Sequence, residues 1–219
     1  MTLKINVKVC YFLPLFTLLS QIGCSTQPDN DRSLPAHKLQ KMPAVTGEAE
    51  HLPISPSSRI VDLSHFRAPE TLAGLTLDGE ISSQHGRTLQ YRSQDAKEKL
   101  SLTLTGLPAG WDDMPAERAV ASYYSEVRQR RVSQALQDSA NALTIVNETL
   151  MDLEGQPSAQ AQLRWVERGR PIQNQSLLIT LIDRNVFIRI SNASYRQTPR
   201  WLLQHGKRAL AEFRAAQTP

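Results

Sequence analysis

Apolar and polar residues alternate along the middle of the chain in the manner of β-strands. Leu100, Leu102 and Leu104 are separated by serine and threonine, which is the period of a half-buried strand. Apolar-rich or alternating stretches predict further strands over residues 87–93, 143–153, 159–167, 175–182 and 186–191. These segments predict a sheet that is built mainly from neighbouring antiparallel strands.

Two features of the later strands indicate how they are connected and covered. The polar tripeptide Asp183-Arg184-Asn185 separates the last two strands, a length and composition that predict a hairpin. The continuous apolar run from Leu177 to Ile179 predicts a central strand that is covered on both faces. We expect Trp165, on one face of its strand, to belong to the core.

A helix is predicted between the first and second groups of strands, from Pro115 to about Gln137. Asp112 and Asp113 precede it, and we expect these carboxylates to cap its positive end. The spacing of apolar residues predicts a buried stripe that includes Val120, Tyr124, Val127 and Leu136.

A second helix is predicted at the end of the chain, from the cap Thr198-Pro199 to about Ala215. It has an apolar stripe of Leu202, Leu203, Gly206, Ala209, Leu210 and Phe213. Trp201 projects roughly 135° away from the centre of that stripe. Either it packs against the 192–197 loop or it is exposed, and an exposed tryptophan would suit an interaction anchor. Trp201 is therefore the candidate partner-binding residue.

The order of these elements resembles the Mog1/PsbP-like fold over about residues 74–216. The most recognisable parts are Gly155-Gln156-Pro157 before the strand at 159–166, the polar hairpin, and the segment 199–213. The resemblance implies an α+β protein, an α/β/α sandwich with a mainly antiparallel sheet, a middle helix and a long C-terminal helix. Proteins of this fold bind partners or assist assemblies. Residues 59–219 are enough chain for one such domain with a single core.

The first 23 residues have the pattern of an export signal. Lys4 and Lys8 precede an apolar run from Val9 to Leu19, which has the length of a signal h-region and is short for a membrane span. Gly23-Cys24 then resembles the lipobox of bacterial lipoproteins, although Gln21 stands where an aliphatic residue is usual. The resemblance implies cleavage before Cys24 and acylation of its thiol with chains such as palmitate. The alternative is an ordinary secretory signal with a chance cysteine.

The residue after the cysteine bears on location, because lipoproteins with aspartate there commonly stay in the inner membrane. Ser25 occupies that position, so the resemblance implies the outer membrane, with the domain facing the periplasm. The mature chain would keep Cys24 as its one cysteine, since Cys10 lies in the signal. A disulfide within the domain is thereby excluded.

Residues 24–58 differ in composition from the domain that follows. They contain recurrent proline with polar and charged residues and no apolar periodicity, which predicts a disordered linker. Fully extended, such a linker reaches about 110 Å.

Charge gives little reason to expect a nucleic-acid partner. The chain has 25 basic and 21 acidic residues, and loss of Lys4 and Lys8 with the signal leaves 23 against 21. Arg128, Arg130 and Arg131 form the densest basic cluster, but no aromatic residues are interleaved with it. We interpret the cluster as a solvated helix face and not as a nucleic-acid interface.

The sequence contains no linear catalytic or phosphate-binding motif of the common kinds. Its five histidines are scattered, at His37, His51, His65, His85 and His205. A metal site assembled from the last three is the alternative to our expectation of no metal and no cofactor.

These observations favour a lipid-anchored envelope protein whose domain is a non-catalytic binding or accessory module. Two alternatives remain open: a hydrolase-like envelope enzyme with a site built from separate loops, and a pilot or chaperone lipoprotein of an outer-membrane assembly. A convergent polar pocket with strongly shifted pKa values would favour the enzyme. An apolar surface near Trp201 would favour the partner-binding classes.

Overall fold

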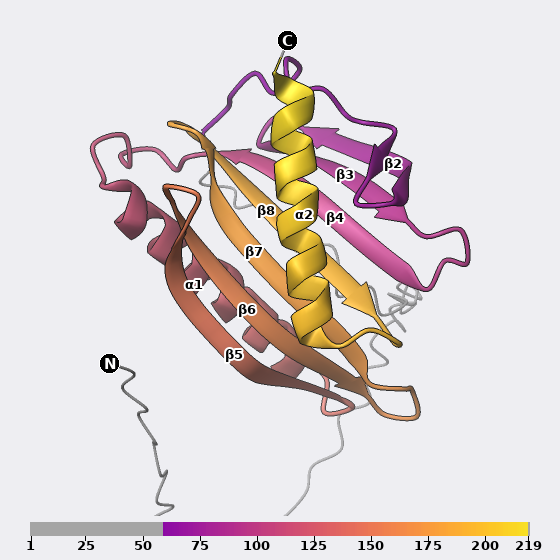
Figure 1. Cartoon of the computed structure of the whole chain (residues 1–219). Coiled ribbons are helices and arrows are strands. Elements are labelled where there is room, and N and C mark those ends of the chain that lie inside the picture. Colours follow the sequence, from indigo (N-terminus) through magenta and orange to yellow (C-terminus); the bar gives the residue numbers. More distant parts are fainter. Residues whose placement is uncertain (1–58, 219) are drawn as a thin grey trace, which may run out of the picture. The chain divides into compact units, whose positions relative to one another are not determined.

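The computed structural model describes residues 59–218. The predicted signal, the predicted acylation site Cys24 and the predicted linker therefore lie outside the described residues. Within them, eight strands form one sheet in the order β1-β2-β3-β4-β8-β7-β6-β5 (Figure 1). All neighbouring strands are antiparallel. The strands are β1 (Thr71–Leu72), β2 (Leu75–Ser83), β3 (Gly86–Arg92), β4 (Glu98–Gly106), β5 (Asn141–Leu153), β6 (Gln156–Glu167), β7 (Gln173–Asp183) and β8 (Val186–Ser194).

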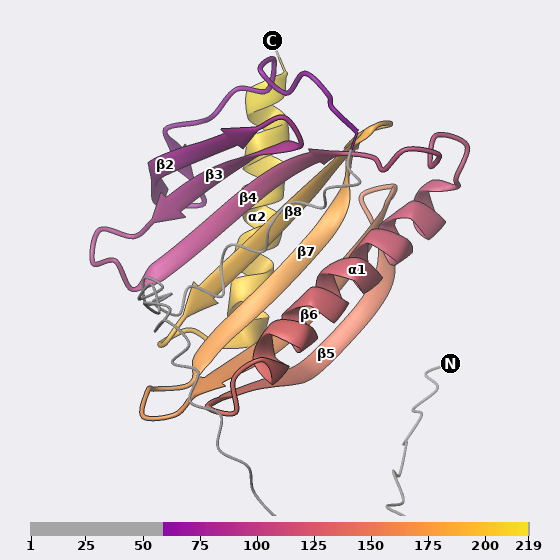
Figure 2. The same cartoon turned by 180° about the vertical axis from the view of Figure 1, so that it is seen from behind.

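Two helices cover opposite faces of this sheet (Figures 1 and 2). Helix α1 (Ala116–Leu136) follows β4 and packs on β5, β6 and β7. Helix α2 (Pro199–Gln217) ends the fold and packs on β6, β7 and β8, with a smaller contact to β1. The predicted α+β class and antiparallel sheet are confirmed, and the α/β/α layering is present where both helices contact β6 and β7. Neither helix of residues 59–218 is long and apolar enough to cross a membrane.

The sequence did not predict the first two strands, β1 and β2. The first strand that it predicted begins at residue 87. In β2 only Leu75 is buried, and most of the other side chains are exposed. The register with β3 also shifts between Leu77 and Gly79. A mostly solvated strand with an interrupted alternation carries little apolar signal.

The expectation that the strand containing Leu100, Leu102 and Leu104 is half-buried was wrong. Those leucines belong to the core beneath α2, but the alternating serine and threonine residues of β4 are buried as well. Their hydroxyls meet side chains of neighbouring elements: Thr103 Oγ1 lies 3.1 Å from Thr88 Oγ1 of β3 and accepts a hydrogen bond from Arg189 of β8 at 3.4 Å. Thr105, for example, donates a hydrogen bond from its hydroxyl to the Tyr123 hydroxyl of α1 at 3.3 Å.

The core is divided by the sheet into two layers. The layer toward α2 includes Leu102, Ile190 and Phe213, and the layer toward α1 includes Val127 and Phe187. Strand β7 supplies residues to both, with Leu178 toward α2 and Leu177 and Ile179 toward α1. The prediction of a central strand covered on both faces is therefore confirmed. Trp165 is 7% exposed and is part of the core, as expected.

The buried stripe of α1 is only partly the one expected. Val120 and Val127 are buried, but Tyr123 is buried in place of Tyr124, and Leu136 is 80% exposed. The Tyr123 ring stacks on Phe187 with centroids 4.4 Å apart. The Tyr124 hydroxyl instead donates to Glu148 of β5. The remaining buried residues of this helix face are Ala119, Arg131 and Ala135.

One residue of this buried face is charged: Arg131, which is 4% exposed. Its guanidinium donates to Gln175 Oε1 of β7 at 2.7 Å and to Ser191 Oγ of β8 at 3.3 Å. The interpretation of the arginine cluster as a solvated face is therefore wrong for Arg131. It is right for Arg128, which pairs with Glu148 in solvent.

The expected capping role of Asp112 and Asp113 is also wrong. Helix α1 starts at Ala116 after Pro115, and no side chain bonds to its free N–H groups as a cap. Asp112 instead accepts two hydrogen bonds from the Arg59 guanidinium, at 2.8 and 2.6 Å. A long-range ion pair has thus replaced the local interaction that the sequence suggested.

Helix α2 matches its prediction at its start. The Thr198 hydroxyl accepts a hydrogen bond from the Trp201 N–H at 3.2 Å, and Pro199 is the first helical residue. The glycine within the predicted stripe has a packing role, because a Cβ at Gly206 would lie 3.0 Å from Asn192 Nδ2. That amide donates to Leu202 O at 2.7 Å and joins α2 to β8.

The buried contacts of Arg131 give a first prediction. We expect Arg131→Met to lower the free energy of unfolding by about 1–3 kcal/mol, since it leaves buried acceptors on β7 and β8 without this donor. The matched control, Arg128→Met on the same helix, removes an exposed ion pair and should cost less than about 1 kcal/mol. Denaturant unfolding of both variants measures the difference, and equal losses would contradict the assignment.

Candidate functional site

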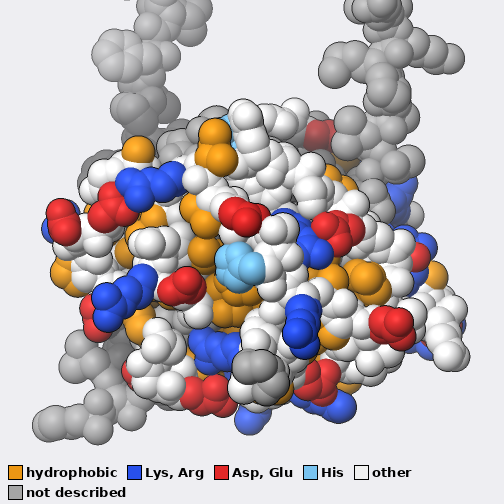
Figure 3. Space-filling view, turned by 90° about the horizontal axis from the view of Figure 1, so that it is seen from above, with side chains coloured by type: hydrophobic (Ala, Val, Ile, Leu, Met, Phe, Trp, Pro, Cys, Tyr) orange, Lys and Arg blue, Asp and Glu red, His pale blue; other side chains and the backbone are white. Residues whose placement is uncertain are grey.

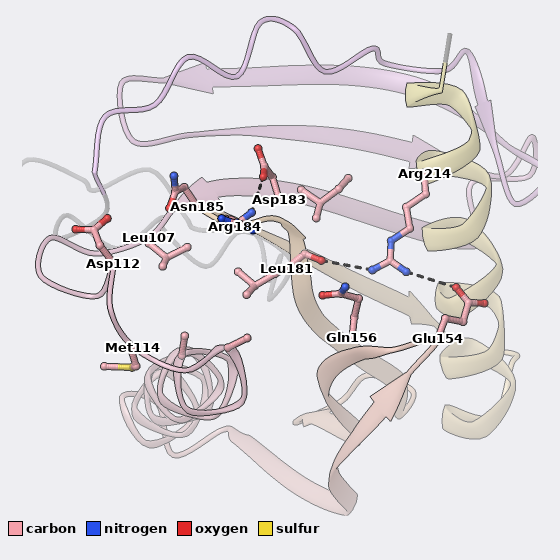
Figure 4. Close-up of a pocket in the computed structure, with 13 residues that line it drawn as sticks. Leu107, Asp112, Met114, Glu154, Gln156, Leu181, Asp183, Arg184, Asn185 and Arg214 are labelled. Atoms are coloured by element: carbon pink, nitrogen blue, oxygen red, sulfur yellow. Dashed lines mark hydrogen bonds and ion pairs between the residues drawn. The ribbon is translucent and has the colours of Figure 1, made fainter.

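A cavity of about 700 Å³ lies at the end of the sheet where β7 turns into β8 (Figure 4). Four separate parts of the chain contribute to its wall. They are the β4–α1 connection with the start of α1, the β5–β6 turn, the β7–β8 hairpin, and the last turns of α2. The lining residues are Leu107, Asp112, Met114, Ala116, Ala119, Glu154, Gln156, Leu181, Ile182, Asp183, Arg184, Asn185 and Arg214.

Two tight turns place side chains at the mouth of this cavity. In the β5–β6 turn Glu154 and Gly155 both have positive φ, 57° and 77°, the conformation of the turn that matches the twist of paired strands. The Gly155 N–H donates to Asp152 Oδ1 at 2.8 Å. In the predicted β7–β8 hairpin, which is confirmed, Asp183 pairs with Val186. Only Arg184 and Asn185 therefore connect the two strands.

The three carboxylates of the lining are each held by a hydrogen-bond donor. Asp112 is held by Arg59, as described above, and Asp183 accepts a hydrogen bond from the Arg184 N–H. Glu154 pairs with Arg214 at 3.4 Å, and Arg214 also donates to Leu181 O. Figure 4 shows Arg214 reaching from α2 between these two partners. These contacts fix the orientation of the carboxylates at the cavity wall.

The cavity combines an apolar lining with charges of both signs. Its apolar contributors include Leu107, Met114 and Leu181, and its charged ones are three carboxylates and two guanidinium groups. Seen from above, this side of the molecule presents acidic and basic side chains mixed with apolar ones (Figure 3). Such a surface suits a ligand or polypeptide segment with an apolar body and polar ends. It is poorly suited to a polyanion, which needs a surface of one sign.

The groups with the largest pKa shifts among residues 59–218 lie elsewhere in the fold. Burial raises the pKa of Tyr91 on β3 to about 12. Hydrogen bonds from Ser93 and Lys97 lower the pKa of Asp95 to about 2 in the β3–β4 turn. Burial and the neighbouring Glu148 raise the pKa of Tyr124 on α1. These shifts accompany structural contacts, so they do not mark the cavity as an acid–base centre.

Trp201 belongs to a different surface. Its side chain is 40% exposed, and its ring stacks on His205 at 4.6 Å between centroids. His205 in turn bonds to Ala73 O at 2.7 Å. The residue lies in the first turn of α2, whereas Arg214 of the cavity lies in the last. Its role as a partner anchor stays a prediction.

The histidines considered for a metal site have separate surroundings. The His65 ring lies 4.1 Å from that of Phe66, His85 bonds to Gln84 in the β2–β3 turn, and His205 bonds to Ala73. Within residues 59–218 no group of three or more His, Cys, Asp or Glu is placed to hold a metal ion. His37 and His51 are outside the described residues.

Sequence reasoning did not find the cavity. Its charged contacts join distant residues, as in Arg59 with Asp112 and Glu154 with Arg214. The only local signals were the turns themselves, Gly155 and the polar hairpin at 183–185. The β5–β6 and β7–β8 turns lie at the same end of the antiparallel sheet. The sequence could therefore have indicated that these turns are neighbours, but not which side chains line a cavity between them.

Comparison with known proteins gives a limited result. No family model matches the chain, and no curated protein matches it. Among solved structures, the chain is similar to cyanobacterial PsbP (CyanoP) from Synechocystis sp. PCC 6803, at 15% identity and a TM-score of 0.42. That alignment covers 64% of this chain and 85% of CyanoP.

Two further solved structures show weaker similarity. Protein PA94 of unknown function from Pseudomonas aeruginosa aligns at 15% identity and a TM-score of 0.30, over 55% of this chain and 72% of PA94. CalU16 from Micromonospora echinospora aligns at 11% identity and a TM-score of 0.24, over 59% of this chain and 83% of CalU16. Similarity at this level identifies no function for the chain.

The partial exposure of Trp201 gives a second prediction. We expect Trp201→Ala to cost about 1 kcal/mol of unfolding free energy, the size of a lost aromatic contact. Phe213 lies on the buried face of the same helix, and Phe213→Ala should cost about 3–5 kcal/mol. Thermal unfolding of the two variants provides the comparison. A loss for Trp201→Ala as large as that for Phe213→Ala would show a core residue and remove it as a surface anchor.

Proposed function

We propose that the chain is a lipid-anchored protein of the bacterial cell envelope whose domain is a non-catalytic binding module. The observation that carries this proposal is the cavity at the end of the sheet. It gathers apolar and charged side chains from four separate parts of the chain at the ends of a rigid sheet. Binding residues are commonly found on connections that such a scaffold positions.

The hydrogen bonds of the cavity's charged groups support a role in recognition. Asp112 and Glu154 are held by arginines, and Asp183 accepts a backbone N–H. Carboxylates whose oxygens are held by hydrogen-bond donors in this way offer oriented acceptors to a ligand. The mixture of both signs favours a polypeptide or zwitterionic partner.

The remaining parts of the proposal come from the sequence. Gly23-Cys24 supports the lipid anchor, and Ser25 supports the outer membrane with the domain in the periplasm. A linker over 24–58 would let the domain reach partners away from the lipid surface. The order of elements, with one helix on each face of the sheet, supports a Mog1/PsbP-like domain, in which binding and accessory roles are usual.

The anchor gives a third prediction. Mass spectrometry of the N-terminus, on protein purified from its own envelope, should find cleavage before Cys24 and acyl chains on that residue. Cys24→Ser should abolish acylation and release the protein from the membrane fraction, because the anchoring energy of about 0.8 kcal/mol per buried methylene is lost. An unmodified Cys24, or cleavage at another position, would overturn the lipoprotein assignment.

The cavity gives a fourth prediction, tested by photo-crosslinking in the intact envelope. We expect a photoreactive benzoylphenylalanine in place of Arg184 to give a defined adduct, since Arg184 lines the cavity. The matched control places the same group at Arg168, an exposed arginine in the turn between β6 and β7, at the other end of β7. Mass spectrometry identifies the adducts. No adduct at position 184, or the same adduct at both positions, would contradict binding at the cavity.

A further inference from the structure

The outer edge of the sheet at β5 is the second surface with features of a binding site. Among the described strands, β5 lies last in the sheet and pairs only with β6. It is also the longest strand, with 13 residues. Three of its apolar side chains, Val146, Leu150 and Met151, are exposed. A long edge strand with exposed apolar residues offers backbone groups and side-chain contacts to another extended chain.

A smaller cavity adjoins this edge. It has a volume of about 290 Å³ and lies between the second half of β5 and the start of α1. Its lining residues are Glu117, Val120, Leu150, Met151, Asp152, Pro157 and Ser158. Leu150 is opposite Ala159 in the register, and Ala159 belongs to the core layer toward α1. Leu150 therefore extends that layer to the edge, where it is 58% exposed.

The charges at this edge are acidic. Glu117 and Asp152 line the small cavity, and Glu148 precedes Leu150 by two residues on the same face of β5. Strand β5 itself contains no lysine or arginine. Arg128 already pairs with Glu148. Near Leu150, the carboxylates that line the small cavity are therefore those of Glu117 and Asp152. An incoming chain with basic residues would complement them.

We propose that this edge binds an extended peptide as an additional strand of the sheet. Side chains on a strand alternate between its faces, so residues two apart in the peptide point toward α1 together. One aliphatic side chain would enter the small cavity, and lysine or arginine two positions away would meet Glu117 or Asp152. Backbone hydrogen bonds to β5 would supply affinity, and the cavity and carboxylates would supply specificity.

A second copy of the chain fits this edge less well. Antiparallel pairing of two β5 strands would bring Glu148 and Asp152 of each copy to the interface and no cation from either strand. The register of β5 also shifts between Ile145 and Asn147. Such a bulge interrupts regular pairing along an edge. A short peptide can pair with residues 147–153 alone, whereas a second full-length β5 would meet the bulge.

Peptide binding to the full chain tests the proposal. The probe is a fluorescent peptide of sequence Thr-Lys-Thr-Leu-Thr-Lys-Thr, and its control has glutamate in place of both lysines. We expect the basic probe to bind and the acidic one to bind at least about tenfold more weakly, a difference of about 1.4 kcal/mol. Hydrogen exchange of residues 141–153 should slow when the basic probe is bound.

Variants locate the binding to the edge. Leu150→Ser should weaken binding by about tenfold, as loss of an interface anchor does, and Glu117→Gln should weaken it and reduce its dependence on salt. Ile81→Ser is the matched control, because Ile81 is exposed on β2 toward the other edge of the sheet. It should leave binding unchanged. Both positions are exposed, so neither change should alter folding much.

Several results would overturn the proposal. Unchanged affinity in Leu150→Ser, or binding without slower exchange in residues 141–153, would place the peptide elsewhere. A dimer in sedimentation that Leu150→Ser converts to a monomer would assign the edge to a second copy. Faster exchange in β5 after Lys38→Gln and Lys41→Gln would assign it to the chain's own upstream segment. None of these results involves Arg184, so they are distinguishable from a failure of the cavity proposal.

Discussion

The structure depends on the burial of both faces of its central strands. In β7 and β8 neighbouring residues point to opposite sides and are apolar on both, as with Leu178 and Ile179, or Phe187 and Ile188. Each such side chain contributes about 1.5–3 kcal/mol when it is removed from water. Neither face can remain solvated, so each needs a helix. Helix α1, inserted after β4, supplies one cover, and α2, placed after β8, supplies the other.

The same coverage traps polar groups, and the fold accommodates them by hydrogen bonding across elements. Arg131, on the buried face of α1, donates hydrogen bonds to Gln175 of β7 and Ser191 of β8. On the other face Asn192 bonds to the backbone of α2. Buried polar groups are costly without partners. These contacts therefore fix where each helix lies along the sheet, which apolar packing alone specifies less sharply.

Because both faces of β6 and β7 are covered by helices, the two candidate binding surfaces lie at an end and at an edge of the sheet. The larger cavity lies at an end of the sheet, beside the β7–β8 hairpin, where turns meet and α2 contributes Arg214. The outer side of β5 is an edge, where backbone groups and Leu150 are accessible. Part of each lining belongs to the core layer toward α1: Leu107, Ala119 and Leu181 in the larger cavity, and Val120 in the smaller one.

The sequence by itself determined the elements whose cause is local. Apolar-rich or alternating stretches identified six of the eight strands, the polar tripeptide identified the β7–β8 hairpin, and Thr198-Pro199 identified the start of α2. Tertiary structure decided the rest. It paired Asp112 with Arg59 instead of the helix start, buried Arg131 and Tyr123 in place of Leu136 and Tyr124, and added β1 and β2 to the sheet. A local sequence pattern indicates only which side of a short segment is buried on average. Ion pairs, cavities and sheet edges depend on which distant segments become neighbours, and that is set only when the chain packs.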